Sequence, residues 1–206
     1  MTIRRVETPV HGRFFYELRD PAHLLVGFHG YAENAQVHME ELRKLPAAER
    51  WSLAAVQALH PFFVRGGPGI GASWMTAQDR ELAIADNLEY VRRAVGSLPR
   101  PEALVFLGFS QGVAMAFRAA ADFGERCQAV IALGGDVPPE LVDEQVQLPP
   151  VLLARGRTDE WYIDEKFKQD LRFLESVTEV TPCVFDGGHE WTDEFRAAAG
   201  RFLASF

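Results

Sequence analysis

The sequence predicts the α/β class, in which a mostly parallel central sheet carries helices on both of its faces. Three observations indicate this class. Short, continuously apolar runs recur along the chain, as they do in strands that are buried on both faces. Stretches with apolar residues at helical spacing separate most of these runs, and such alternation builds right-handed βαβ units. The length of 206 residues suits one domain, so we expect residues 1–206 to fold as a single domain.

Seven apolar runs that are bounded by turn residues are the expected strands, at 14–18, 24–28, 53–56, 104–109, 129–133, 151–154 and 180–185. Five helices are expected between and after them, at 34–45, 80–98, 111–123, 164–176 and 192–205. The helix at 80–98 has the clearest pattern, because Leu88, Val91 and Val95 recur near a period of 3.6 and Pro99 follows. Two segments break the alternation and are expected to be long loops, at 60–75 and 136–150.

Composition and charge exclude several classes of protein. The chain is 48% hydrophobic with a net charge of −8, and residues 104–206 hold all of this excess, with 9 basic and 17 acidic side chains. Without a basic stripe we expect no nucleic-acid partner. No apolar run reaches the ~18–20 residues that span a bilayer, and the start lacks a signal-peptide core, so we expect a cytoplasmic protein without stable membrane insertion. The chain is compatible with either a monomer or a homodimer.

The two cysteines do not indicate a disulfide-stabilised framework. The two cysteines, Cys127 and Cys183, resemble small buried hydrophobes, and a disulfide between them stays open at this point. No cluster of His, Cys and Asp has the spacing of metal ligands, so we expect no metal and no cofactor. The glycine-rich stretch 66–71 lacks the Lys-Ser/Thr ending of a phosphate-binding loop and contains Pro68. We interpret that stretch as a flexible loop over the functional site.

The sharpest motif is Gly108-Phe-Ser-Gln-Gly112, which follows the strongest expected strand and opens an alanine-rich helix. A nucleophile elbow requires this context, with Ser110 on a tight turn and glycines where strand and helix backbones approach each other. The helix N-terminus aims the backbone N–H of Gln111 at a developing oxyanion. The alternative is a Gly-Ser turn that serves packing alone.

A serine nucleophile needs a base and an acid that orients the base. In strand–helix folds with this elbow the chain order is serine, acid, histidine, and among six histidines only His189 follows Ser110. Asp159 lies just past the expected strand 151–154 and is the favoured acid. Asp136 is its main rival. Asp164 and Asp186 are weaker ones.

The second oxyanion donor is expected from the turn after the strand 24–28. Gly30 lets the chain turn there, so that the N–H of Tyr31 faces the hydroxyl of Ser110. His29 precedes the serine, and we expect it to be structural rather than a base. An ordinary strand-ending turn is the alternative for this stretch.

These motifs, Phe28-His-Gly-Tyr-Ala, Gly108-Phe-Ser-Gln-Gly, Arg155-Gly-Arg-Thr-Asp and Gly187-Gly-His, resemble the phospholipase/carboxylesterase family of α/β-hydrolases, which includes the acyl-protein thioesterases. The resemblance runs from Leu24 to the C-terminus. It implies an α/β-hydrolase fold, a triad of Ser110, Asp159 and His189, and an oxyanion hole formed by the N–H groups of Tyr31 and Gln111. The chain departs from the family at Val113 and Ala32, where glycine is usual, and at 160–162, where Glu-Trp-Tyr replaces Val-Pro.

The leading hypothesis is therefore a serine hydrolase that acts on small-molecule carboxylic esters or thioesters. Within enzymes, an acyl-protein thioesterase, a lipase and a peptidase or amidase are alternatives, and a non-catalytic binding module is the alternative from another class. The side chains expected to bind substrate are Phe62, Phe63, Trp74, Met75 and Trp161, although the first four would equally well fill core. With no separate cap domain and an acidic rim around the site, we expect neutral esters of short to medium length to be preferred.

Overall fold

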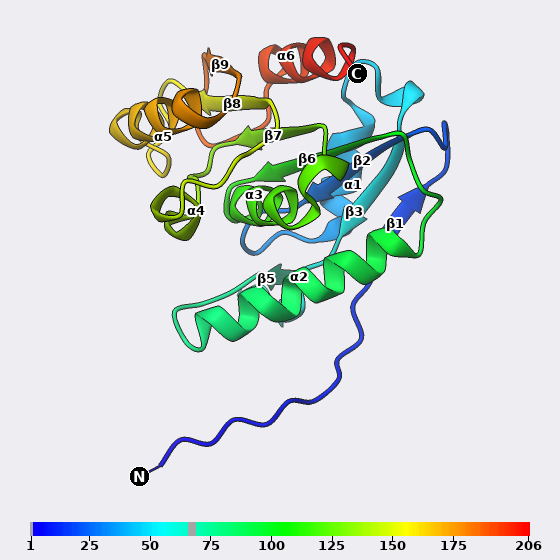
Figure 1. Ribbon diagram of the computed structural model, residues 1–206, viewed down its shortest axis with the longest axis vertical. Coiled ribbons are helices and arrows are strands. Elements are labelled where there is room, and N and C mark those ends of the chain that lie inside the picture. Colours follow the sequence, from blue (N-terminus) through cyan, green and yellow to red (C-terminus); the bar gives the residue numbers. More distant parts are fainter. Residues whose placement is uncertain (1, 66–68) are drawn as a thin grey trace.

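The computed structural model describes residues 2–65 and 69–206, and its centre is a seven-stranded sheet (Figure 1). The strands are β1 (Phe14–Glu17), β2 (His23–Phe28), β3 (Ser52–Val56), β6 (Ala103–Phe109), β7 (Ala129–Leu133), β8 (Val151–Gly156) and β9 (Val180–Phe185). Their order across the sheet is β1-β3-β2-β6-β7-β8-β9. Every neighbouring pair is parallel except β1 and β3, which are antiparallel. The predicted α/β class with a mostly parallel sheet is confirmed.

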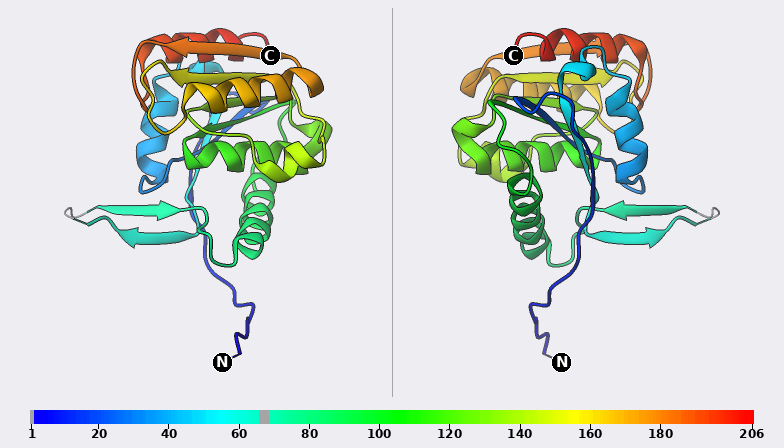
Figure 2. Two further views of the ribbon diagram at one scale, coloured as in Figure 1. Left: turned by 90° about the vertical axis from the view of Figure 1, so that its left-hand side faces the viewer. Right: turned by 90° about the vertical axis from the view of Figure 1, so that its right-hand side faces the viewer.

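Helices cover both faces of the sheet, as predicted (Figures 1 and 2). The α-helices are α1 (Ala35–Arg43), α2 (Arg80–Gly96), α3 (Gln111–Phe123), α4 (Pro139–Asp143), α5 (Asp164–Val177) and α6 (Asp193–Leu203), with 3-10 turns at Ala48–Arg50 and Gly124–Arg126. Residues of α2 to α5 share one core cluster, and residues of α1 and α6 share the other. In the described parts of the chain, none of the helices combines the length and apolarity that crossing a membrane requires.

The continuous apolarity of the strands follows from this two-sided cover. In β6, Leu104 and Phe106 pack into the cluster beneath α2 and α3, whereas Val105 and Leu107 pack into the cluster beneath α1 and α6. All four side chains are at most 3% exposed. Burying one such side chain stabilises the fold by about 1.5–3 kcal/mol. Successive residues of each strand therefore stabilise the helical layers on opposite faces of the sheet.

The two predicted loops contain regular structure. The segment 60–75 contains an antiparallel hairpin, β4 (His60–Phe63) paired with β5 (Ile70–Ser73), which extends outward from the body of the protein (Figure 2). Gly66, Gly67 and Pro68 of the expected flexible loop lie outside the described residues. The segment 136–150 contains the short helix α4. Both cysteines are free thiols, which answers the open question of a disulfide.

Candidate active site

Ser110 lies at the turn between β6, the middle strand of the sheet, and the first residue of α3. Its φ is +52°, a conformation that costs a non-glycine residue free energy and that clusters at functional sites. The turn has no room for side chains on either flank. A Cβ on Gly108 would lie 2.4 Å from the carbonyl oxygen of Gly112, and a Cβ on Gly112 would lie 2.0 Å from that of Phe28. The two glycines of the motif are therefore required by close backbone contact.

His189 reaches the serine from the loop between β9 and α6. Its Nε2 lies 2.8 Å from the Ser110 hydroxyl oxygen, and its Nδ1 lies 2.8 Å from Oδ2 of Asp159. These contacts fit the tautomer in which Nδ1–H donates to the carboxylate and Nε2 accepts from the hydroxyl. The ring also lies against Phe109, with the ring centroids 5.0 Å apart. The imidazole is thus fixed from three sides.

Asp159 follows β8 and is only 4% exposed. Its second carboxylate oxygen, Oδ1, accepts the backbone N–H groups of Trp161 and Tyr162, each at 2.9 Å. A buried carboxylate needs such partners, and here they leave Oδ2 directed at the histidine. Of the four sequence-predicted acids, Asp159 is the one the structure brings to His189.

The three rival acids are paired elsewhere. Asp136 accepts from Lys166 at 3.0 Å. Asp164 accepts from Arg155 and Asp186 accepts from Arg157, each at 3.0 Å. None of the three lies within hydrogen-bond distance of His189 in the part of the chain that the structure describes.

The backbone N–H groups of Tyr31 and Gln111 lie near Ser110 and have no acceptor within residues 2–65 and 69–206. Gln111 is the first residue of α3, where a helix leaves its N–H groups without intrahelical partners. The turn before Tyr31 passes close to the serine, since a Cβ on Gly30 would lie 3.3 Å from the Cβ of Ser110. The structure therefore brings both predicted oxyanion donors to the Ser110 turn.

This turn is held by side chains on either side of it. The Gly30 N–H donates to Glu33 at 2.8 Å. His29 is fully buried, donates from Nδ1 to the Gly30 carbonyl at 2.7 Å, and accepts the Ala58 N–H at 3.0 Å. Burial lowers the pKa of His29 to about 4, so the ring is neutral at pH 7. Ala32, the next residue after Tyr31, adopts a φ of +61°.

Solved structures with the same chain path were found by comparison. An acyl-protein thioesterase 2 from Zea mays superposes with a TM-score of 0.73 at 18% identity, covering 95% of this chain and 99% of that one. A phospholipase/carboxylesterase from Dyadobacter fermentans superposes with a TM-score of 0.72 at 17% identity, covering 97% and 100%. The protein has the α/β-hydrolase fold. The resemblance that the motifs indicate is thus confirmed at the level of the fold.

A third structure with this chain path is a carboxylesterase from Mesorhizobium loti, with a TM-score of 0.69 at 19% identity, covering 95% of this chain and 94% of that one. No family model and no curated protein matches the sequence. At this identity the comparisons establish the fold, and the argument for function rests on the site itself.

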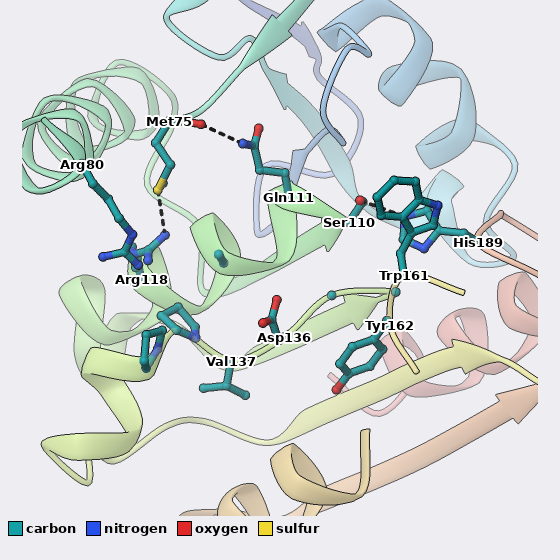
Figure 3. Close-up of a pocket in the computed structure, with 15 residues that line it drawn as sticks. Met75, Arg80, Ser110, Gln111, Arg118, Asp136, Val137, Trp161, Tyr162 and His189 are labelled. Atoms are coloured by element: carbon teal, nitrogen blue, oxygen red, sulfur yellow. Dashed lines mark hydrogen bonds between the residues drawn. The ribbon is translucent and has the colours of Figure 1, made fainter. Parts of the chain in front are cut away.

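Beside Ser110 and His189 the α/β-hydrolase fold encloses a cavity of about 250 Å³ (Figure 3). Side chains from α3, the loop after β7 and the loop after β8 line it, together with Met75 and Arg80. The lining residues are Met75, Arg80, Ser110, Gln111, Ala114, Arg118, Gly134, Gly135, Asp136, Val137, Pro138, Pro139, Trp161, Tyr162 and His189. Among the described residues, no group of three or more His, Cys, Asp or Glu side chains has a geometry that could hold a metal ion.

Two of the five side chains predicted to bind substrate line this cavity, Met75 and Trp161. Trp74 does not, because its ring is fully buried in the core and its Nε1–H donates to the His29 carbonyl at 2.9 Å. Phe62 and Phe63 lie on the hairpin, outside the cavity. The structure contradicts an acyl-pocket role for Trp74, which fills core. Phe62 and Phe63 do not line this cavity, and the Phe62 ring packs against Tyr31 with the ring centroids 5.5 Å apart.

The predicted acidic rim is also wrong for this cavity. The charged side chains that line it are two arginines, Arg80 and Arg118, and one aspartate, Asp136. Glu140, an acidic residue of the same segment, accepts hydrogen bonds from both arginines. Overall charge of a half-chain therefore says little about a cavity, because tertiary packing decides which side chains face it.

Sequence reasoning also missed the side chain of Gln111. Its Oε1 accepts the Trp74 N–H at 3.0 Å, and its Nε2 donates to the Met75 carbonyl at 3.0 Å. The glutamine of the motif thereby fixes the segment after β5 at the mouth of the cavity. Arg118, which lines the cavity, was not predicted either. Helical spacing could have indicated it, since positions 111, 114 and 118 fall on one face of α3.

Proposed function

We propose that the protein is a serine hydrolase that cleaves carboxylic esters or thioesters through an acyl-enzyme on Ser110. The observation that carries the proposal is the hydrogen-bonded chain from Ser110 through His189 to the buried Asp159. This order and geometry match the roles of nucleophile, base and orienting acid. The fold-level similarity to structures described as esterases and thioesterases supports the same reaction class.

The proposed reaction uses each group at its observed place. His189 Nε2 takes the proton of the Ser110 hydroxyl as the oxygen attacks the substrate carbonyl. Asp159 holds the ring in the required tautomer and stabilises the imidazolium that forms. The Tyr31 and Gln111 N–H groups donate to the oxyanion of the tetrahedral intermediate, an interaction worth about 2.7–4 kcal/mol per donor in well-studied cases. The protonated His189 then returns the proton to the leaving alcohol or thiol.

Deacylation repeats these steps with water. His189 takes a proton from a water molecule as the water oxygen adds to the acyl carbon. When the second intermediate collapses, the acyl–oxygen bond to Ser110 breaks, and the protonated His189 returns the proton to the Ser110 oxygen as the carboxylic acid is released. The Asp159 side chain is buried, and the His189 side chain is 20% exposed, so water reaches the base but not the acid. No further group is required for atoms and charges to balance.

The decisive experiment is active-site labelling with a fluorophosphonate, combined with turnover of 4-nitrophenyl butyrate. We expect covalent labelling of the tryptic peptide that contains Ser110 and hydrolysis that the label abolishes. Ser110→Ala should lose the label and lower kcat by about 10⁴–10⁶. The matched control, Ser176→Ala at an exposed position, should keep both. A folded wild-type protein with neither labelling nor turnover would support a non-catalytic binding module instead.

A further inference from the structure

The end of the cavity away from Ser110 contains a pair of arginines that share one carboxylate. Nε of Arg118 donates to Oε1 of Glu140 at 2.7 Å, and Nη2 of Arg80 donates to Oε2 of the same residue at 3.3 Å. The Arg118 side chain is 3% exposed and that of Arg80 is 39% exposed. Figure 3 shows both guanidinium groups side by side, across the cavity from Ser110 and His189.

This pair has more donors than the protein satisfies. Among the described residues, the other contact of Arg118 is from Nη1 to the sulfur of Met75 at 3.7 Å, and thioethers are weak acceptors. Nη2 of Arg118 and the Nε and Nη1 of Arg80 donate to no acceptor in that part of the chain. Within the described residues neither arginine has a buried atom without a partner, so the unused guanidinium donors face the cavity and are free to bind an acceptor there.

The charges around the pair favour an anion of low charge. Arg80 and Arg118 line the cavity together with Asp136, and Glu140 accepts from both arginines. Lys166 pairs with Asp136 at 3.0 Å, and Asp170 lies near both of them. Burial lowers the pKa of the Arg118 guanidinium, and the hydrogen bond to Glu140 opposes that shift. The three cationic and three anionic groups balance one another, so a singly charged carboxylate adds less uncompensated charge here than a phosphate monoester would.

The geometry of α3 fixes how far this pair lies from the reacting serine. Arg118 follows Ser110 by eight residues, which is about 12 Å along a helix axis. Helical side chains lean toward the N-terminus, so the guanidinium lies nearer to the serine than its Cα does. At about 1.2 Å per bond of extended chain, fewer than about ten bonds separate the two sites. Ala114, on the same face of α3, leaves space for a chain between them.

We propose that Arg118 and Arg80 form a carboxylate subsite, so that the enzyme prefers an ester or thioester that carries one carboxylate a short chain away from its scissile carbonyl. This inference rests on the proposed function, because it assigns the substrate class of that same site. Arginine forks suit carboxylates in geometry as well as in charge. This carboxylate subsite replaces the earlier expectation that neutral esters are preferred, which rested on the negative charge of the chain.

The test compares esters of equal length that differ in one charge. The first series contains 4-nitrophenyl esters of dicarboxylic acids with four to eight carbons, each beside its neutral ω-methyl ester. The second series places the carboxylate on the alcohol side, as ω-carboxyalkyl acetates beside their methyl esters, followed by acid release. We expect kcat/KM to favour the charged member at least tenfold in one of the two series, and that series identifies the side on which the anion lies.

Variants then assign the preference to the arginines. Arg118→Gln should lower the charged-to-neutral ratio by about tenfold to a hundredfold, the size expected for a lost charge-assisted hydrogen bond. Arg118→Lys should recover part of that ratio. Arg80→Gln, at a more exposed position, tests the same subsite if Arg118→Gln fails to fold. Arg157→Gln, whose guanidinium pairs with Asp186 at the surface, should leave the ratio and the activity unchanged.

The results separate this subsite from the reaction itself. Turnover of neutral esters with no preference for the charged member in either series would overturn the subsite and leave the hydrolase intact. If both arginine variants keep the wild-type ratio of kcat/KM for charged over neutral esters, the subsite is likewise overturned and the hydrolase stands. A stronger preference for a phosphonate of equal length would overturn the choice of a carboxylate. Loss of both labelling and turnover on every ester would remove the hydrolase and the subsite together.

Discussion

Asp170 is a buried carboxyl whose replacement by asparagine should change the pH dependence of stability. It lies on α5 and is 7% exposed. Its Oδ2 accepts the Tyr162 hydroxyl at 2.8 Å and the Val137 N–H at 3.3 Å, and both of those residues line the cavity. Burial raises the pKa of Asp170 from its ordinary value of 3.8 to about 6. Asparagine keeps an acceptor oxygen for both donors but has no charge to bury.

The magnitude follows from this difference in pKa. The folded and unfolded pKa values of Asp170 differ by about two. At 1.36 kcal/mol for each unit, the linked free energy is about 3 kcal/mol. Between pH 3.8 and about 6 the folded protein holds the proton and the unfolded chain releases it, so the free energy of unfolding falls as pH rises. Below this window the contribution is fully present, and above pH 6 it is lost.

The measurement is urea unfolding of wild type and Asp170→Asn at pH 4, 5, 6, 7 and 8. The free energy of unfolding of the variant minus that of wild type should increase by about 3 kcal/mol from the lowest pH to the highest. Burial also lowers the pKa of His29 to about 4 and of His38 to about 3, which removes stability below pH 6.5. That loss occurs in both proteins and cancels in the difference.

Asp143→Asn is the matched control, because Asp143 is exposed at the end of α4. Its difference from wild type should stay flat across the same pH range. A flat difference for Asp170→Asn as well would refute the reasoning, since it would mean that folding costs this carboxylate no more than it costs an exposed one.

Three more substitutions test the site and its supports. Asp159→Asn should lower kcat by about 10⁴ in an ester assay through the wrong histidine tautomer, whereas Asp136→Asn should lower it by no more than tenfold; the reverse ranking would move the acid to the loop after β7. Gly112→Ala should lower the free energy of unfolding in urea by at least about 3 kcal/mol, because the new Cβ would lie 2.0 Å from a carbonyl oxygen of β2. In the control, Gly96→Ala, the new Cβ has no atom of the described residues within 4 Å, and stability should not fall. His38→Leu should raise the free energy of unfolding at pH 7 by about 1–3 kcal/mol, because both nitrogens of this buried ring lack hydrogen-bond partners in the described residues; a lower stability would show that the ring is satisfied in solution.

The main sheet and the serine turn could be predicted from the sequence because both follow from local rules. β6 and β8 are apolar on two sides, and that pattern is visible without any knowledge of their neighbours. The glycines at 108 and 112 flank Ser110 because the backbones of strand and helix touch there, which makes the motif specific. Seven strands and five helices were predicted within a few residues of their observed bounds for this reason.

The hairpin and the cavity did not follow from local rules. β4 and β5 pair only with each other; three of the four β4 residues are exposed and three of the four β5 residues are buried, so neither strand has the alternating pattern that would reveal it in the sequence. Arg118 stands in an apolar helix, and only the packing of α3 against Glu140 of α4 reveals that it is buried and paired. Nothing in the sequence indicated that the Tyr162 hydroxyl reaches Asp170 on α5 or that its ring is buried.

The order of the strands has a consequence for how the site comes apart. Ser110 follows the middle strand of the sheet, Asp159 follows the next strand but one, and His189 follows β9, which lies at the edge. Edge elements open at lower free energy than central ones, since fewer neighbours must be broken. Backbone amides of β9 should therefore exchange with deuterium sooner than those of β6. Mild denaturant would then displace the imidazole while the serine turn is still folded, and catalytic loss would precede the global unfolding transition.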